Sequence, residues 1–177
     1  MPSTPLVGLW TLISITARAA DGTLTPEVYG ANPVGYLTYT ATGHMMVMFA
    51  RGDRPRLSGQ ADSPFSLDSV PIEELAQAFT GFSAYAGTYT LQDKTVHHHL
   101  TTASIPNRVG TTLVRTFSLR GDRLTLSTPA ITAAGPALVF ELEWERLPFA
   151  LPNIKADSPD LSLSESLPKA TVKEHRP

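Results

Sequence analysis

The stretch that decides the fold is Tyr85-Ala-Gly-Thr-Tyr-Thr-Leu-Gln-Asp-Lys-Thr-Val-His-His-His-Leu100. It predicts a β-hairpin whose turn, residues 92–95, brings Leu91 and Val96 face to face. Side chains alternate between the two faces of a strand, so the faces can be counted outward from this pair. One face collects the aromatic and apolar side chains together with a single histidine, His98. This face should point into a core.

The three consecutive histidines are divided by the same alternation. His98 falls on the apolar face with Tyr85 and Tyr89, whereas His97 and His99 fall on the opposite face among threonines. Consecutive strand residues point apart, so the three imidazoles cannot surround one ion, and we predict no metal site. Two interpretations of His98 stay open. It is either a neutral core imidazole hydrogen-bonded to one of these tyrosines, or a general acid or base that acts on a ligand.

Length and composition limit the protein class. The 177 residues are 42% hydrophobic with a net charge of −2 and no cysteine, which excludes thiolate chemistry and gives no basic field for nucleic acid. We expect residues 1–147 to form one domain and 148–177 to form a tail rich in proline and serine. The N-terminus lacks the pattern of a signal peptide, so we expect a cytoplasmic protein with no membrane partner. A homodimer stays open, and no cofactor is expected.

The rest of the chain carries strand and turn signals. Residues 6–16 alternate weakly, 138–147 alternate strictly, and hairpin turns are expected at 41–43 and 120–123. Residues 50–67 contain three arginines and two prolines and should form a long loop at one rim. Seven or eight short antiparallel strands are typical of a closed barrel or a sandwich.

One helix interrupts the strands. Ser69 is a suitable N-cap, Pro71 suits the first turn, and Leu75, Phe79 and Phe82 recur at helical spacing. We therefore expect a single short helix that begins after Ser69.

The hairpin at residues 120–123 also places an arginine inside the predicted barrel. Its pairing puts Arg115 on the same face as Leu113 and Phe117 and opposite Thr128. A buried guanidinium needs compensation. Arg115 either closes one barrel end by stacking on Trp10, or it anchors an anion or a carbonyl of a ligand.

The hairpin at residues 41–43 supplies a further part of the inner wall. Its inward residues should be Leu37, Tyr39, Met45, Val47, Phe49 and, beyond them, Arg51.

Five motifs together resemble a known family. They are Leu6-Val-Gly-Leu-Trp-Thr-Leu12, Pro33-Val-Gly-Tyr-Leu-Thr-Tyr-Thr-Ala-Thr-Gly-His-Met45, Ala84-Tyr-Ala-Gly-Thr-Tyr-Thr90, Pro106-Asn-Arg-Val-Gly-Thr111 and Gly121-Asp-Arg-Leu-Thr-Leu-Ser-Thr128. In order and spacing, residues 6–147 resemble the short lipocalin-like domain of fungi and bacteria. The resemblance implies an all-β, antiparallel up-and-down barrel of about eight strands with an apolar cavity.

The chain departs from the pattern of that family at two positions. The family usually has an aromatic residue after the Pro-Asn pair, where this chain has Arg108. It often has an acid two residues after its histidine pair, where this chain has Thr101. Both departures favour a specialised ligand or a drifted site.

The resemblance also implies a function. Fungal lipocalin-like proteins occur among the tailoring steps of natural-product pathways, some as cyclases or isomerases. We expect the barrel to bind an apolar, ring-containing small molecule, and we hypothesise cofactor-free cyclisation, isomerisation or dehydration by His98, Arg115 and Tyr89. A non-catalytic carrier is the alternative. The expected ligand-binding residues are Trp10, Leu37, Tyr39, Met45, Val47, Phe49, Tyr85, Asn107, Leu113, Phe117 and Thr128.

Overall fold

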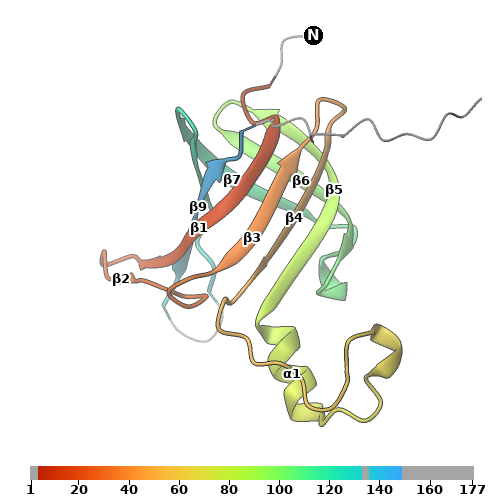
Figure 1. Cartoon of the computed structure of the whole chain (residues 1–177). Helices are drawn as coiled ribbons and strands as arrows, with labels where there is room; N and C mark the ends of the chain where they lie inside the picture. Colours follow the sequence, from red (N-terminus) through yellow and green to blue (C-terminus); the bar gives the residue numbers. More distant parts are fainter. Residues whose placement is uncertain (1–3, 133–135, 149–177) are drawn as a thin grey trace, which may run out of the picture.

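The computed structural model describes residues 4–132 and 136–148, which form one antiparallel sheet of nine strands. The long strands are β1 (Gly8–Ala19), β3 (Val34–Tyr39), β4 (His44–Ala50), β5 (Phe82–Gln92), β6 (Thr95–Ala103), β7 (Thr112–Arg120), β8 (Arg123–Ser127) and β9 (Leu138–Arg146). Neighbouring strands run antiparallel, and β9 returns to pair with β1, which closes the barrel (Figure 1). The predicted up-and-down lipocalin-like barrel is therefore confirmed. Apart from Pro148, the predicted tail lies outside the described residues.

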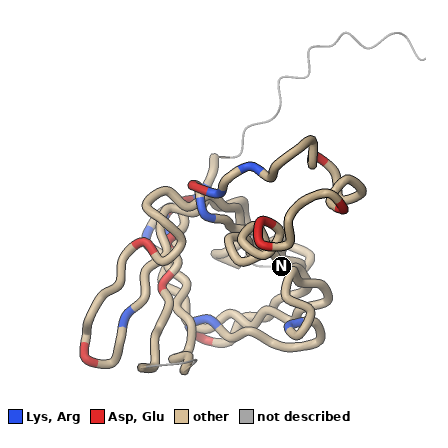
Figure 2. The backbone as a smooth tube through the Cα atoms, turned by 90° about the horizontal axis from the view of Figure 1, so that it is seen from below, with Lys and Arg blue, Asp and Glu red and all other residues tan. Residues whose placement is uncertain are grey.

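The structure contains one short strand that the sequence analysis did not predict. β2 (Leu24–Thr25) pairs with the end of β1. Seen from below, the strands form a ring, and the charged residues are spread around it (Figure 2). Within the described residues, no helix is long and apolar enough to cross a membrane.

The opening hairpin has the predicted register near its turn. Leu91 pairs with Val96 and Tyr89 pairs with His98, so His98 does face the interior. Further along, a bulge between Ala86 and Gly87 leaves one extra residue on β6. The bulge is compatible only with a glycine at position 87, because a Cβ there would lie 1.9 Å from the carbonyl oxygen of the facing strand.

The barrel has a closed end and an open end. The closed end lies at the hairpins 40–43 and 92–95, where the N-terminal segment crosses, and large side chains fill it. The largest fully buried residues are Trp10, Trp144, Tyr39, Leu6, Leu37, Met45, Leu124, His98 and Val96. The open end lies at the opposite ends of the strands, on the side of the helix (Figure 1). A cavity in the interior of the barrel lies on this helix side.

Arg146, rather than Arg115, closes the filled end. Its guanidinium lies 4.0 Å from the ring centroid of Trp10 and donates hydrogen bonds to the carbonyl oxygens of Val7 (2.6 Å) and Pro5 (2.8 Å). Trp10 and Arg146 face each other across β1 and β9. Stacking on Trp10 was one of the two interpretations of Arg115, and it is wrong because the strand that closes the barrel carries its own arginine.

The helix is shorter than predicted at both ends. α1 spans Ile72–Thr80 and begins after Pro71, with no side-chain cap, so Ser69 is not its N-cap. Phe82 lies outside the helix, as the first residue of β5, where it pairs with Ala50. Gly81 is the C-cap of the helix: its N–H donates to the carbonyl oxygen of Gln77 (3.1 Å), and the chain enters β5 at the next residue.

Two 3₁₀ helices lie in the connecting segments. η1 (Pro64–Ser66) lies in the long loop predicted over residues 50–67, and η2 (Pro106–Arg108) forms the Pro-Asn turn between β6 and β7. The second of these places Arg108 beside the open end.

Candidate functional site

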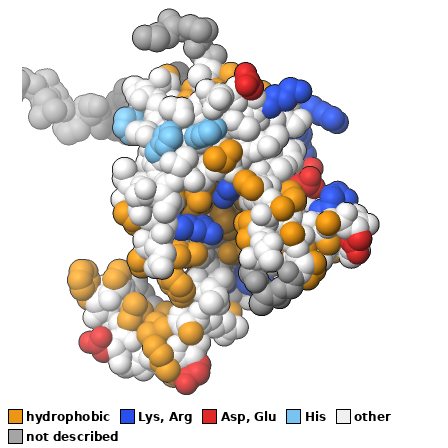
Figure 3. Space-filling view, turned by 180° about the vertical axis from the view of Figure 1, so that it is seen from behind, with side chains coloured by type: hydrophobic (Ala, Val, Ile, Leu, Met, Phe, Trp, Pro, Cys, Tyr) orange, Lys and Arg blue, Asp and Glu red, His pale blue; other side chains and the backbone are white. Residues whose placement is uncertain are grey.

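A cavity of about 400 Å³ lies inside the open end of the barrel, and we call it the chamber. Its apolar wall consists of Ile15, Tyr29, Phe49, Phe79, Phe82, Tyr85, Ile105, Ile131, Phe140 and Leu142, and its polar residues are Thr80, Ser83, Arg108, Arg115 and Thr128. The volume falls within the roughly 300–1,000 Å³ typical of small-molecule sites. Figure 3 shows a hollow in which hydrophobic side chains surround basic ones.

The polar side of the chamber carries positive charge. Arg115 comes from β7 and donates a hydrogen bond from Nη1 to the carbonyl oxygen of Val114 (2.8 Å), while Arg108 comes from η2. Among the described residues that line the chamber there is no aspartate or glutamate. Within the described part of the chain, neither arginine forms an ion pair. A ligand in the chamber therefore meets cationic donors and no competing carboxylate.

The tyrosine hydroxyls of the chamber remain protonated at neutral pH. Burial raises the pKa of Tyr85, and the charges of Arg115 and Arg108 offset this only in part. Burial also raises the pKa of Tyr29, again against the charge of Arg108. Protonated hydroxyls can donate hydrogen bonds to an acceptor on a ligand.

His98 lies outside the chamber, in the filled end of the barrel. Its Nε2 is 2.7 Å from the hydroxyl of Tyr39, so its partner is neither Tyr85 nor Tyr89. Its Nδ1 has no partner among the described residues. Burial, with a smaller contribution from the charge of Arg115, lowers the pKa of His98 to about 3. The imidazole is therefore neutral, which favours its interpretation as a core residue.

A pH titration of stability should reveal this buried neutral histidine. With a pKa of about 3 in the folded state and 6.5 when unfolded, only the unfolded chain takes up a proton between these values. Stability should fall as the pH drops, by about 2 kcal/mol between pH 6.5 and 4.5. Urea unfolding at several pH values measures this. The His98→Gln variant should lack this part of the slope, and an unchanged slope would contradict the assignment.

Tyr89, the third predicted catalytic residue, also lies at the closed end, where its hydroxyl is hydrogen-bonded and its ring is packed. Its hydroxyl donates to the carbonyl oxygen of Thr40 (3.0 Å) and lies 3.1 Å from Oγ1 of Thr4. Its ring packs edge-on against Tyr39, with centroids 4.8 Å apart. Tyr89 is not among the residues that line the chamber.

The predicted ligand-binding residues separate into two groups along the barrel. Phe49, Tyr85 and Thr128 line the chamber, as does Arg115 of the predicted catalytic set. The residues packed in the core away from the chamber are Trp10, Leu37, Tyr39, Met45, Val47, Leu113 and Phe117. Asn107 is exposed and does not line the chamber either. The sequence analysis did not predict the lining residues Phe79 of α1, Phe82 of β5, and Phe140 and Leu142 of β9.

The outer histidines bond to threonines, as the face assignment suggested. Nε2 of His97 lies 3.1 Å from Oγ1 of Thr95, and Nε2 of His99 lies 3.0 Å from Oγ1 of Thr90. Within the described residues, no group of three His, Cys, Asp or Glu side chains is placed to hold a metal ion.

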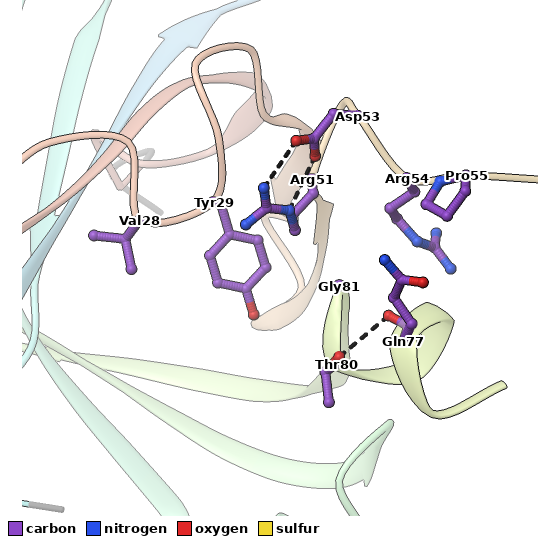
Figure 4. Close-up of a pocket in the computed structure, with 9 residues that line it drawn as sticks. All are labelled: Val28, Tyr29, Arg51, Asp53, Arg54, Pro55, Gln77, Thr80 and Gly81. Atoms are coloured by element: carbon purple, nitrogen blue, oxygen red, sulfur yellow. Dashed lines mark hydrogen bonds and ion pairs between the residues drawn. The ribbon is translucent and has the colours of Figure 1, made fainter. Parts of the chain in front are cut away.

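A second hollow, which we call the rim pocket, adjoins the chamber (Figure 4). It has a volume of about 330 Å³ and is lined by Val28, Tyr29, Arg51, Asp53, Arg54, Pro55, Gln77, Thr80 and Gly81. Tyr29 and Thr80 line both spaces, so they form the boundary between the two. Arg51 forms an ion pair with Asp53 (2.8 Å) here, so it does not continue the inner wall as predicted.

Comparison with known proteins places the barrel in a family. The chain is 36% identical over 86 residues, 43% of this chain and 77% of the relative, to the 4'-hydroxy-3'-methoxypropiophenone carrier protein ppsC of Aspergillus oryzae. The crystal structure of Rv2717c from M. tuberculosis aligns with 84% of this chain and 99% of its own at 14% identity, with a TM-score of 0.32. The model of the lipocalin-like domain matches residues 7–147, from the residue before β1 to the residue after β9. The chain therefore belongs to the lipocalin-like domain family.

Proposed function

We propose that the protein is a non-catalytic carrier that binds an apolar, ring-containing small molecule in the chamber. The observation that carries this proposal is an apolar cavity of about 400 Å³ whose few polar lining residues include hydrogen-bond donors and no carboxylate among the described residues. The relative from Aspergillus oryzae is named as a carrier of 4'-hydroxy-3'-methoxypropiophenone, an aromatic ketone, which supports the same ligand class here.

The chamber offers a complementary surface to such a compound. Phe49, Phe82 and Phe140 contribute aromatic wall against which a ring can pack. Arg115 and the hydroxyl of Tyr85 can donate hydrogen bonds to a carbonyl oxygen. Burying the ring contributes affinity, and the few donors set its orientation.

The chamber offers less to catalysis than to binding. Among the described lining residues there is no histidine or carboxylate, so the chamber holds no base with a pKa near neutrality. His98, the predicted general base, is neutral, and its Nε2 is occupied by Tyr39. Arg115 could polarise a carbonyl without moving a proton. Cyclisation, isomerisation or dehydration by this protein stays a prediction, and the geometry favours the carrier.

Fluorescence titration tests the carrier directly. N-phenyl-1-naphthylamine, an apolar reporter that brightens in apolar surroundings, should bind at one molecule per chain, with native mass spectrometry giving the stoichiometry. 4'-Hydroxy-3'-methoxypropiophenone should displace it and should be recovered unchanged after prolonged incubation, as judged by NMR. Absence of saturable reporter binding would contradict a binding function, and chemical conversion of the ketone would contradict a carrier.

A further inference from the structure

We propose that the chamber selects anionic ligands: an oxyanion, such as a carboxylate, phenolate or enolate, on an apolar ring, held between Arg108 and Arg115. This inference rests on the proposed function, because it names the class of molecule that the chamber carries.

The charge inventory of the described residues supports the proposal. The arginines in ion pairs there are Arg18, Arg51, Arg123 and Arg146. Arg108 and Arg115 have no such partner within residues 4–132 and 136–148, although both are partly buried beside apolar wall. A partly desolvated guanidinium is costly unless its charge and its N–H groups are satisfied. Arg115 uses one N–H group on the carbonyl oxygen of Val114, which leaves others for a ligand.

The guanidinium groups of Arg108 and Arg115 face the same cavity. Arg108 is in η2 and Arg115 is in β7, the strand that follows it, and both line the chamber. Both charges lower the pKa of the Tyr85 hydroxyl against the effect of burial, which places them near one donor. No carboxylate is among the charges that shift the pKa of Tyr85 or of His98. Two like charges repel, and an oxyanion between them would relieve that repulsion.

An anion gains more from this arrangement than a neutral carbonyl does. Both ligands can accept a hydrogen bond from a charged guanidinium, but an oxyanion adds the attraction between two opposite full charges, which a neutral carbonyl lacks. The surrounding phenylalanines lower the local dielectric constant and reduce screening by salt. A weakly acidic phenol or enol should therefore bind preferentially in its deprotonated form.

Two competitors of equal shape separate charge from apolar fit. We would displace N-phenyl-1-naphthylamine with 2-naphthoate, an anion at pH 7, and with 2-naphthamide, its neutral counterpart. The natural protein should bind the naphthoate at least about tenfold more tightly, as expected for one strong charge-assisted contact. In Arg115→Met the ratio of the two affinities should fall to within about threefold.

Controls keep the outcomes distinct. Arg120→Met removes an equal charge from the exposed end of the same strand and should retain the full preference. Arg108→Met provides a second variant if Arg115→Met does not fold. If the reporter binds but the natural protein shows no preference, or if both variants retain it, the anion inference is overturned while the binding function stands. If the reporter does not bind the natural protein at all, the proposed function fails first.

Discussion

Replacing Ser83 by tryptophan should weaken the binding of N-phenyl-1-naphthylamine by at least about a hundredfold, a loss of about 2.7 kcal/mol. Ser83 is 4% exposed, lines the chamber and pairs with Phe49 across β4 and β5. An indole at this position would enter the space that the ligand needs. The added ring fills an existing hollow, so the barrel should still fold. Titration of the variant with the reporter measures the loss, and thermal unfolding checks the fold.

The same strand offers a matched control for that substitution. Thr88 is exposed on the outer face of β5, so Thr88→Trp adds the same indole outside the barrel. Its affinity for the reporter should stay within about twofold of the natural protein. Equal binding by the Ser83 and Thr88 variants would mean that the ligand does not occupy the chamber.

Replacing Arg146 by methionine should lower the free energy of unfolding by about 3 kcal/mol. The guanidinium lies 4.0 Å from the Trp10 ring centroid and donates to the carbonyl oxygens of Val7 and Pro5. These contacts tie the N-terminal segment to the closed end of the barrel. Methionine retains part of the packing but leaves both carbonyl groups without this donor. Urea unfolding followed by tryptophan fluorescence measures the loss.

A neighbouring arginine shows how much of that effect comes from charge alone. Arg123 forms an ion pair with Glu145 (3.2 Å), and both side chains are about half exposed, at 55% and 46%. Arg123→Met should therefore cost less than about 0.5 kcal/mol. If the Arg146 and Arg123 variants lost equal stability, the stacked arginine would not hold the closed end together.

The sequence was sufficient to predict the faces of the strands but not the height of each residue in the barrel. Alternation placed His98, Tyr85 and Arg115 on inner faces, and the structure places them there. Tilt and stagger of the strands decide which inward residues share a level. Tyr85 and Arg115 reach the chamber, whereas His98 lies in the packed layer beside Tyr39. The sequence gives no measure of the position of each side chain along the barrel axis, so it could not show that His98 lies at a different level from Tyr85 and Arg115.

Contacts between distant segments account for the other differences. Which arginine stacks on Trp10 depends on β9 closing against β1, a pairing between the two ends of the domain that no local pattern signals. Arg108 was visible only as a departure from the family pattern, and in the structure it lines the chamber. Phe82 and Phe140 line the chamber and lie in β5 and β9. In the sequence, nothing distinguishes them from apolar strand residues that pack in the core.

The location of the bound ligand tests the central claim most directly. A crystal structure of the complex with 4'-hydroxy-3'-methoxypropiophenone should show the ring between Phe49, Phe82 and Phe140. One ligand oxygen should lie within hydrogen-bonding distance of the guanidinium of Arg115. A ligand beside His98 in the closed end, or on the outer surface with the chamber empty, would contradict the account.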